Sequence, residues 1–269
     1  MRVGFVVEGS HVYNSRTKVD LLQRLWRVEL PRAIGCGTPD HVFGMSKGSV
    51  SAMRLQKMPL KPTTSIAESL DEILERHRLT HGIDCFVIVW DLLPPWDKAA
   101  PLCRWNETLS LYEGLSLSSH LDATFRKYAA DRFQEMSQRK RPNFRPRVPK
   151  AIQGSVLAVC VEPLFESVFM DELAMRKCLG VRGIRTQGWP SGWSRGNARA
   201  SRVVAEAIDA ARDAAPTKPV FRRIRQGYET LKTEWAIHLF QSRLFDNELK
   251  GHPLGTRLNE VVPKNRTWT

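Results

Sequence analysis

Acidic residues stand directly behind the most apolar segments of the chain. Glu8 follows the apolar run of residues 3–7, Asp91 closes the run CFVIVWD, and Glu162 follows a third such run. Carboxylates that lie close together raise one another's pKa, and a divalent cation removes that penalty. Mg²⁺ prefers carboxylate and water oxygens, so this pattern predicts a site for Mg²⁺ or Mn²⁺. The candidate metal ligands are Glu8, Asp91, Asp97, Glu162 and Glu166.

Phosphodiester cleavage is the chemistry that such a site supports, because bound metal ions position a nucleophile and stabilise a leaving oxygen. Glu8 and Asp91 are the predicted catalytic residues. Gly9 has no Cβ, so its backbone can approach a phosphate closely or turn sharply away from the strand. Structural roles stay open as alternatives: Asp91 could cap the following turn, and Glu162 could interact with a helix dipole. Either a metal ion or an Arg partner would explain Glu166, which stands among apolar residues.

Four apolar segments are predicted strands, and helical patterns separate them. The strands cover residues 2–7, 41–46, 85–90 and 155–161. The last two are continuously apolar, which is typical of strands covered on both faces. Alternation of such strands with helices predicts an α/β fold, with a mostly parallel sheet flanked by helices. Ligands bind beyond the carboxyl ends of the strands in such sheets, where these acids stand.

Helical spacing of apolar residues predicts the connecting helices, and Ser65 with Glu68 fits a capping box at the start of one of them. These helices cover residues 19–30, 64–79, 117–138 and 163–179. After residue 180 the composition changes, and a stretch without periodicity precedes helices near 198–214, 218–247 and 254–262. We therefore expect an α/β domain over residues 1–180 and a C-terminal helical extension over residues 181–269 that packs on it.

The charge of the chain predicts a polyanionic partner. The formal net charge is +13 and the pI is near 9.9, which favours nucleic acid. Residues 138–150, QRKRPNFRPRVPK, hold six basic residues, three prolines and no acid. Proline prevents a continuous helix there, so we expect an extended arm that holds a phosphate backbone, with a solvated loop as the alternative. The predicted nucleic-acid-binding residues are Arg139, Lys140, Arg141, Arg145, Arg147 and Lys150.

The order of these motifs resembles the TOPRIM domain, and most of all the small stand-alone TOPRIM-like proteins related to OLD nucleases. In that group an early strand ends in VEG, as Val7-Glu8-Gly9 does here, and a later strand ends in Asp, as at Asp91. A further strand leads into a helix with Glu and Asp, which VEPLFESVFMDEL matches with Glu162, Glu166 and Asp171. The resemblance covers roughly the first 180 residues, with a looser likeness in HPLGTRL.

The resemblance implies a Mg²⁺-dependent nuclease, or a nuclease-related effector, that acts on DNA or RNA. It implies Glu8 as general acid/base or metal ligand and Asp91 as metal ligand, with Asp97 and Glu166 as further candidates. Similar small proteins serve anti-phage defence beside an ATPase, which implies an ATPase or another protein as partner. Family members carry Asp-x-Asp after the third strand, whereas five residues separate Asp91 from Asp97 here. The displaced Asp leaves an alternative: a non-catalytic, basic nucleic-acid- or protein-binding subunit of a larger complex.

A second likeness is to the PIN-like NYN ribonucleases. The segment VEGSHVYN of this chain resembles the opening motif of that family. That family has Asp where Glu8 stands and Asn where His11 stands, and it predicts similar chemistry on a different fold. A P-loop is not expected, because no Lys-Ser/Thr pair follows Gly9. The five cysteines are scattered without a CxxC pair, which predicts a cytoplasmic location. No apolar run reaches about 18 residues, so no membrane partner is expected.

Overall fold

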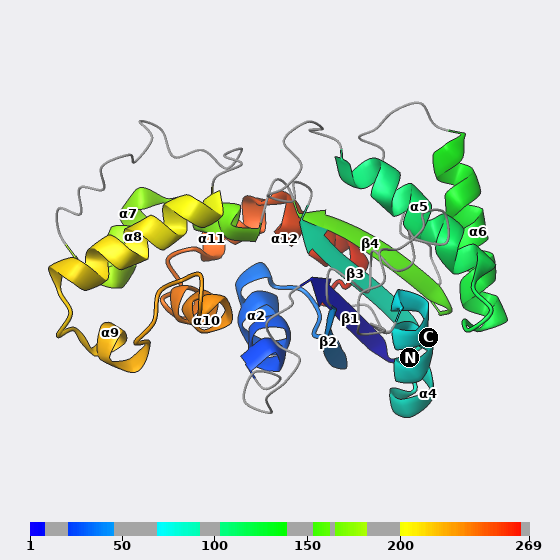
Figure 1. The fold of residues 1–269 in the computed structure, drawn as a ribbon, viewed down its shortest axis with the longest axis horizontal. Coiled ribbons are helices and arrows are strands. Elements are labelled where there is room, and N and C mark those ends of the chain that lie inside the picture. Colours follow the sequence, from blue (N-terminus) through cyan, green and yellow to red (C-terminus); the bar gives the residue numbers. More distant parts are fainter. Residues whose placement is uncertain are drawn as a thin grey trace, which may run out of the picture.

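The computed structural model of the chain (Figure 1) describes residues 1–8, 21–45, 69–91, 103–138, 153–161, 165–181 and 200–264. Within these ranges, the side chains at positions 8, 90, 91, 103–107, 160, 161 and 253 lie outside the description. None of the helices in these ranges has both the length and the apolar character needed to cross a lipid bilayer.

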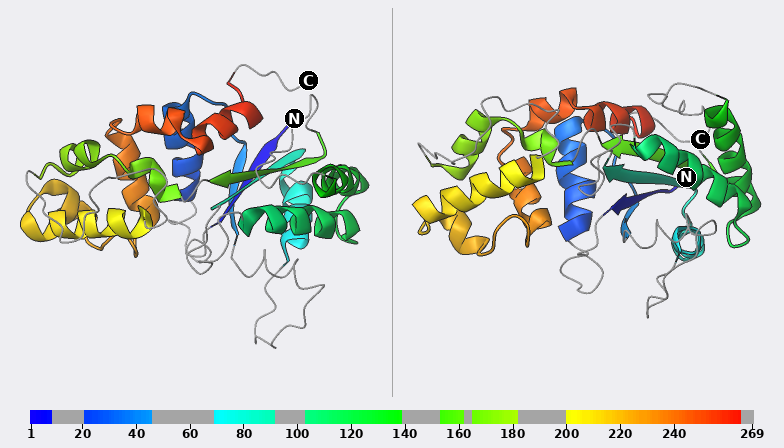
Figure 2. Two further views of the ribbon diagram at one scale, coloured as in Figure 1. Left: turned by 90° about the horizontal axis from the view of Figure 1, so that it is seen from above. Right: turned by 45° about the horizontal axis from the view of Figure 1, so that its top comes forward.

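The sheet has four strands, all parallel, in the order β2-β1-β3-β4. They are β1 (Val3–Glu8), β2 (His41–Met45), β3 (Cys85–Asp91) and β4 (Ser155–Val161). Helices cover both faces of the sheet (Figure 2), so the predicted α/β fold is confirmed. Each strand begins and ends within one residue of its predicted bounds, because apolar runs buried on both faces are an unambiguous pattern.

One face of the sheet packs against α4 (Leu70–His81), α5 (Cys103–Leu117) and α6 (Ala123–Ser137). Alternate strand residues such as Val6 and Ile88 point to this face and meet apolar residues of the three helices. Their neighbours along the strands point to the opposite face, as the period of two along a strand requires. That second face packs against the helix that follows β1 and against the C-terminal helices.

The helix that follows β1 runs through residues 21–34 and ends later than predicted. Its middle part is a π-helical segment, η2 (Leu25–Glu29), which passes directly into α2 (Leu30–Ile34). Pro31 has no N–H to donate, and a π-helical turn is one way in which a helix accommodates such an interruption. Gly35 ends α2 with a φ of 83°, a conformation that glycine adopts without strain.

The long helix predicted over residues 117–138 is wrong in its first part. The structure has two helices instead, α5 and α6, and residues 118–122 connect them. Ser118 Oγ donates a hydrogen bond to Asp71 of α4 at 2.6 Å. Ser118 Oγ also accepts a hydrogen bond from the backbone N–H of Leu121 at 3.2 Å. Asp122 then caps α6 by accepting from Thr124 N. These side-chain contacts fix the connection and start a new helix.

The helix predicted over residues 163–179 is also divided in the structure. A 3₁₀-helix, η4 (Phe165–Phe169), precedes α7 (Glu172–Leu179). Asp171 accepts a hydrogen bond from Ala174 N at 3.0 Å and so caps α7. The capping box predicted at Ser65 and Glu68 lies outside the described residues. The structure describes a capping box at Ser69 and Glu72, at the start of α4.

The C-terminal part consists of helices that share a core with the sheet. They are α8 (Ala200–Ala214), α9 (Pro219–Arg223), α10 (Lys232–Gln241), α11 (Asp246–Gly251) and α12 (Pro253–Val261). The single helix predicted over 218–247 is wrong, because α9, α10 and α11 replace it. Helices α7 to α11 form one half of the molecule, while α2 and α12 lie between that half and the strands (Figures 1 and 2). The boundary at residue 180 stays a prediction.

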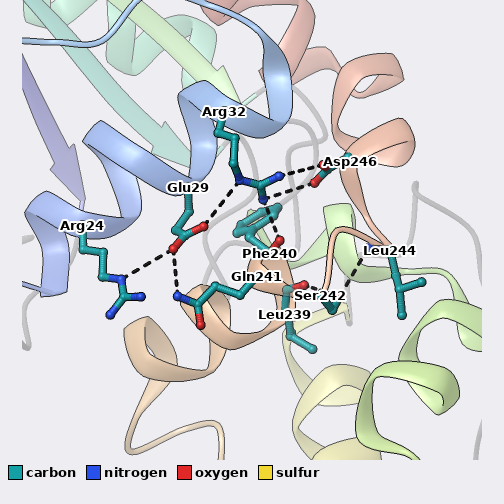
Figure 3. A network of polar contacts seen from close by, with 9 residues as sticks. All are labelled: Arg24, Glu29, Arg32, Leu239, Phe240, Gln241, Ser242, Leu244 and Asp246. Carbon is teal, nitrogen blue, oxygen red and sulfur yellow. Dashed lines mark hydrogen bonds and ion pairs between the residues drawn. The ribbon is translucent and has the colours of Figure 1, made fainter.

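A network of polar contacts joins α2 to this C-terminal half (Figure 3). Arg32 donates to Asp246 Oδ2 at 2.9 Å and to the carbonyl oxygen of Phe240 at 2.7 Å. Glu29, which is 5% exposed, accepts from Gln241 Nε2 at 2.9 Å. Hydrogen bonds to charged groups are among the stronger ones, so this network fixes α10 and α11 against α2.

Candidate functional site

The carboxyl edge of the sheet brings two of the predicted site positions to neighbouring strands. β1 and β3 are parallel neighbours, with Val7 beside Val89. Glu8 is the last residue of β1 and Asp91 is the last residue of β3. Both residues therefore stand at the same edge, which is the first condition that a shared cation imposes.

This edge is also the topological switch point of the sheet. From β1 the chain passes to β2 on one side, and it then returns to β3 on the other side of β1. In open parallel sheets the crevice at such a point, outside the carboxyl ends of the strands, is the usual ligand-binding place. Figure 1 shows these strand ends directed toward the half of the molecule that α7 to α11 form.

Several predicted site residues lie outside the described part of the chain. Asp97 and Glu162 lie outside the described residues, as does His11. The same holds for the whole predicted arm, with Arg139, Lys140, Arg141, Arg145, Arg147 and Lys150. Among the side chains that the structure does describe, no three from His, Cys, Asp and Glu gather as a group that could hold a metal ion. The side chains of Glu8 and Asp91 lie outside the side chains that the structure describes.

Glu166 lies on η4, shortly after the end of β4, and has a cationic partner. Its side chain is 8% exposed, and its Oε1 lies 3.4 Å from Lys232 Nζ. Lys232 also lies 3.3 Å from Glu229 Oε2 and donates to Ser201 Oγ at 3.2 Å. Burial alone would lower the pKa of Lys232, but Glu166 and Glu229 raise it above its usual value. The sequence left a metal ion or an Arg partner as explanations for Glu166. The structure shows a cationic side chain as partner, and that side chain is Lys232.

His252 and Ser167 form a buried pair that looks like a catalytic dyad and has another role. Ser167 Oγ lies 2.7 Å from His252 Nε2, and both residues are at most 1% exposed. The backbone N–H of Leu254 donates to His252 Nδ1 at 3.1 Å. A neutral imidazole that accepts at Nδ1 carries its proton on Nε2, so His252 donates to Ser167. His252 therefore caps α12 and is not placed to remove a proton from the serine.

The HPLGTRL segment begins at this histidine, and its glycine has a packing role. A Cβ at Gly255 would come within 2.0 Å of the carbonyl oxygen of Leu249. Only glycine allows α12 to approach α11 so closely. The looser likeness in this segment thus coincides with residues that hold α12 against its neighbours.

Three histidines gather around Phe43 at the opposite, amino edge of the sheet. The ring of Phe43 stacks on His77 at 3.6 Å between centroids, and the rings of His41 and His81 lie 4.5 Å apart. Burial lowers the pKa of His41, and the neighbouring His81 and Arg27 lower it further. Because His41 is the first residue of β2, this cluster is remote from Glu8 and Asp91. It cannot supply a base to the candidate site.

One further pair of reactive side chains escaped the sequence-based predictions. Cys178 Sγ lies 3.9 Å from His238 Nε2, and Arg223 donates to His238 Nδ1 at 2.9 Å. Burial raises the pKa of Cys178, whereas burial and Arg223 lower the pKa of His238. Both shifts favour the neutral forms, and a nucleophilic cysteine needs the thiolate. The pair therefore packs α7 against α10 without activating the sulfur.

No protein-family model, curated protein or solved structure matches this chain.

Proposed function

We propose that this chain is a Mg²⁺-dependent, TOPRIM-like nuclease, or a nuclease-related effector, that acts on DNA or RNA. The supporting observation is that Glu8 and Asp91 end neighbouring parallel strands at the switch point of the sheet. Mn²⁺, which takes the same kind of oxygen ligands, would replace Mg²⁺. A role in anti-phage defence and an ATPase as partner follow from the resemblance alone and belong to the same proposal.

A magnesium ion needs few carboxylates from the protein, and two acidic positions stand at this edge of the sheet. Mg²⁺ commonly takes one or two protein carboxylates and completes its shell with waters and substrate phosphates. Glu8 and Asp91 would supply these carboxylates, and Asp97 and Glu162 are further candidates. Once bound, the ion would polarise a phosphodiester and lower the pKa of water. As the alternative to a ligand role, Glu8 would accept the proton that leaves the nucleophile, as a general base, while Asp91 holds the ion.

A second candidate function is a non-catalytic, nucleic-acid- or protein-binding subunit. The observation that favours it is the ion pair between Glu166 and Lys232, since a carboxylate that already has a cation nearby is a poorer metal ligand. The displaced position of Asp97 in the sequence and the net charge of +13 agree with this alternative.

Cleavage of supercoiled plasmid and of total RNA, in Mg²⁺, Mn²⁺ or EDTA, separates the two functions. We expect metal-dependent cleavage by the wild type, and a loss of at least about 100-fold in Glu8→Gln and Asp91→Asn, the lower range for a positioned acid–base group. Asp131→Asn makes the same chemical change on α6, where the side chain is 55% exposed, and should retain full activity. Cleavage that survives Glu8→Gln would overturn the proposed mechanism. Binding without cleavage, in folded wild-type protein with either metal, would favour the non-catalytic function.

A further inference from the structure

The segment around α9 is basic and lies between Asp213 and Glu229. Residues 214–228 hold four basic residues and no acid. We name Lys218, Arg222, Arg223 and Arg225 the α9 surface. The three arginines are exposed and Lys218 is partly exposed. This segment was not singled out by the sequence pattern, which places the basic arm at residues 138–150.

The cations of the α9 surface differ from most other described arginines in having no carboxylate partner. None of the four makes an ion pair within the described part of the chain. Arg223 donates to His238, and Lys218 donates to the carbonyl oxygen of Gly180 at the end of α7. By contrast, an Asp or Glu pairs with each of Arg32, Arg78, Arg132, Arg176, Arg202, Arg212 and Arg257.

The backbone beneath the α9 surface is anchored in the core. Phe221 and Ile224 alternate with the exposed arginines and are 4% and 6% exposed. Phe221 packs on Trp235 with ring centroids 5.9 Å apart, and Trp235 Nε1 donates to the carbonyl oxygen of Gln226 at 3.0 Å. The arginines are therefore displayed from a fixed backbone, which reduces the entropy lost when they bind a ligand.

We propose that the α9 surface binds the phosphate backbone of a DNA or RNA duplex. Like charges held together on a fixed segment repel one another, and phosphates spaced along a strand relieve that repulsion while releasing counterions. Contacts of this kind position a nucleic acid without reading its sequence. α9 lies at the far end of the molecule from the strands (Figures 1 and 2), so this surface is separate from the strand edge. The proposal requires no cleavage and stands apart from the proposed nuclease activity.

The salt dependence of duplex binding tests this proposal in the full chain. The variant is Arg222→Gln with Arg225→Gln, and the matched control is Arg126→Gln with Lys127→Gln, two exposed cations of α6. Fluorescence anisotropy with labelled DNA and RNA duplexes, in EDTA, gives the slope of log K against log salt. Two lost phosphate contacts reduce that slope by about 1.8 on duplex DNA, since each contributes about 0.9. If affinities converge near 1 M salt, this slope change amounts to roughly 200-fold weaker binding at 50 mM.

The control variant should keep the wild-type slope, and thermal melting shows that both variants are folded. The proposal is overturned if the two double variants bind alike, or if the wild type binds neither duplex in a salt-dependent way. It is also overturned if polyglutamate competes with the labelled duplex for these arginines as effectively as unlabelled duplex does. The α9 surface would then bind an acidic protein. The assay follows binding alone, in EDTA, so failed cleavage and a failed α9 surface are distinguishable. Comparison of the two duplexes shows which backbone geometry the surface prefers.

Discussion

Replacing Arg32 with alanine should weaken the contact between α2 and the C-terminal helices (Figure 3). Its Nη1 donates to Asp246 Oδ2 at 2.9 Å, and its Nη2 donates to the Phe240 carbonyl oxygen at 2.7 Å. Its Nε lies 3.7 Å from Glu29 Oε2. One substitution thus removes contacts to three groups on three different segments.

The size of the effect follows from the burial of the groups left behind. Hydrogen bonds to charged groups contribute roughly 1.5–3 kcal/mol each, and loss of one partner of a buried ion pair costs about 3–5 kcal/mol. The side chain of Glu29 is 7% exposed, but Gln241 still donates to it. Asp246 is 21% exposed and regains water. We therefore expect a loss near the lower value, about 3 kcal/mol, or about 6–12 °C in melting temperature for a chain of this size.

Urea unfolding followed by circular dichroism measures this loss, and Arg24→Ala is the matched control. Arg24 lies 3.5 Å from the same carboxylate, Glu29, but its side chain is 53% exposed. Exposed ion pairs contribute at most about 1 kcal/mol, so the control should unfold nearly as the wild type does. Equal losses in Arg32→Ala and Arg24→Ala would refute the argument from burial. A loss below about 1 kcal/mol in Arg32→Ala would show that the network does not hold the C-terminal helices in place.

Three further substitutions test particular features of the fold. Gly154→Ala should destabilise by about 2–4 kcal/mol, because φ is 70° there and a Cβ would meet Thr124 Cγ2 at 2.3 Å. Gly35→Ala has a φ of 83° with no atom within 4 Å of its Cβ, so it should cost only about 1 kcal/mol, and equal losses would contradict the clash. Burial and Arg223 lower the pKa of His238, so Arg223→Gln should raise it toward the ordinary 6.5 in an NMR titration. Because the pKa of His238 is lower in the folded state, its contribution to stability is fully present above about pH 6.5 and is lost as the pH falls through the folded pKa. The variant should therefore lose less stability than the wild type between neutral and acidic pH.

The strands could be predicted from the sequence because their signal is local. CFVIVWD and SVLAVCV are apolar at almost every position, and burial on both faces is what such segments require. Once the strands are taken as parallel, the common edge of Glu8 and Asp91 follows from chain direction alone. The register between Val7 and Val89 agrees with that deduction.

Helix boundaries could not be predicted where contacts distant in sequence decide them. α5 carries serines, a threonine and a glycine among its apolar residues, so no clear stripe marks it. It is held by burial of residues such as Tyr112, whose hydroxyl donates to the carbonyl oxygen of Val156 in β4 at 2.9 Å. The break between α9 and α10 lets Phe221 and Trp235 pack against each other. Tertiary packing of this kind overrides local helix propensity.

The partner of Glu166 could not be predicted from the sequence either. An acid among apolar residues indicates that a cation is near, but the pattern does not say which cation. Lys232 is 66 residues away along the chain and reaches Glu166 only because α10 packs beside η4. Within the described part of the chain the α9 arginines have no carboxylate partner, and the sequence did not predict this either, since a run of basic residues does not reveal which carboxylates the fold brings to it.

α10 connects the α9 surface to the segments that flank the sheet. Lys232, its first residue, contacts Glu166, which follows β4 in the sequence. His238, in the last turn of α10, accepts a hydrogen bond from Arg223 of the α9 surface. Six residues of helix separate these contacts, a rise of about 9 Å. Gln241 at the end of α10 donates to Glu29 and so fixes the helix against the segment that follows β1. These contacts hold the α9 surface in a fixed position relative to the helix that follows β1.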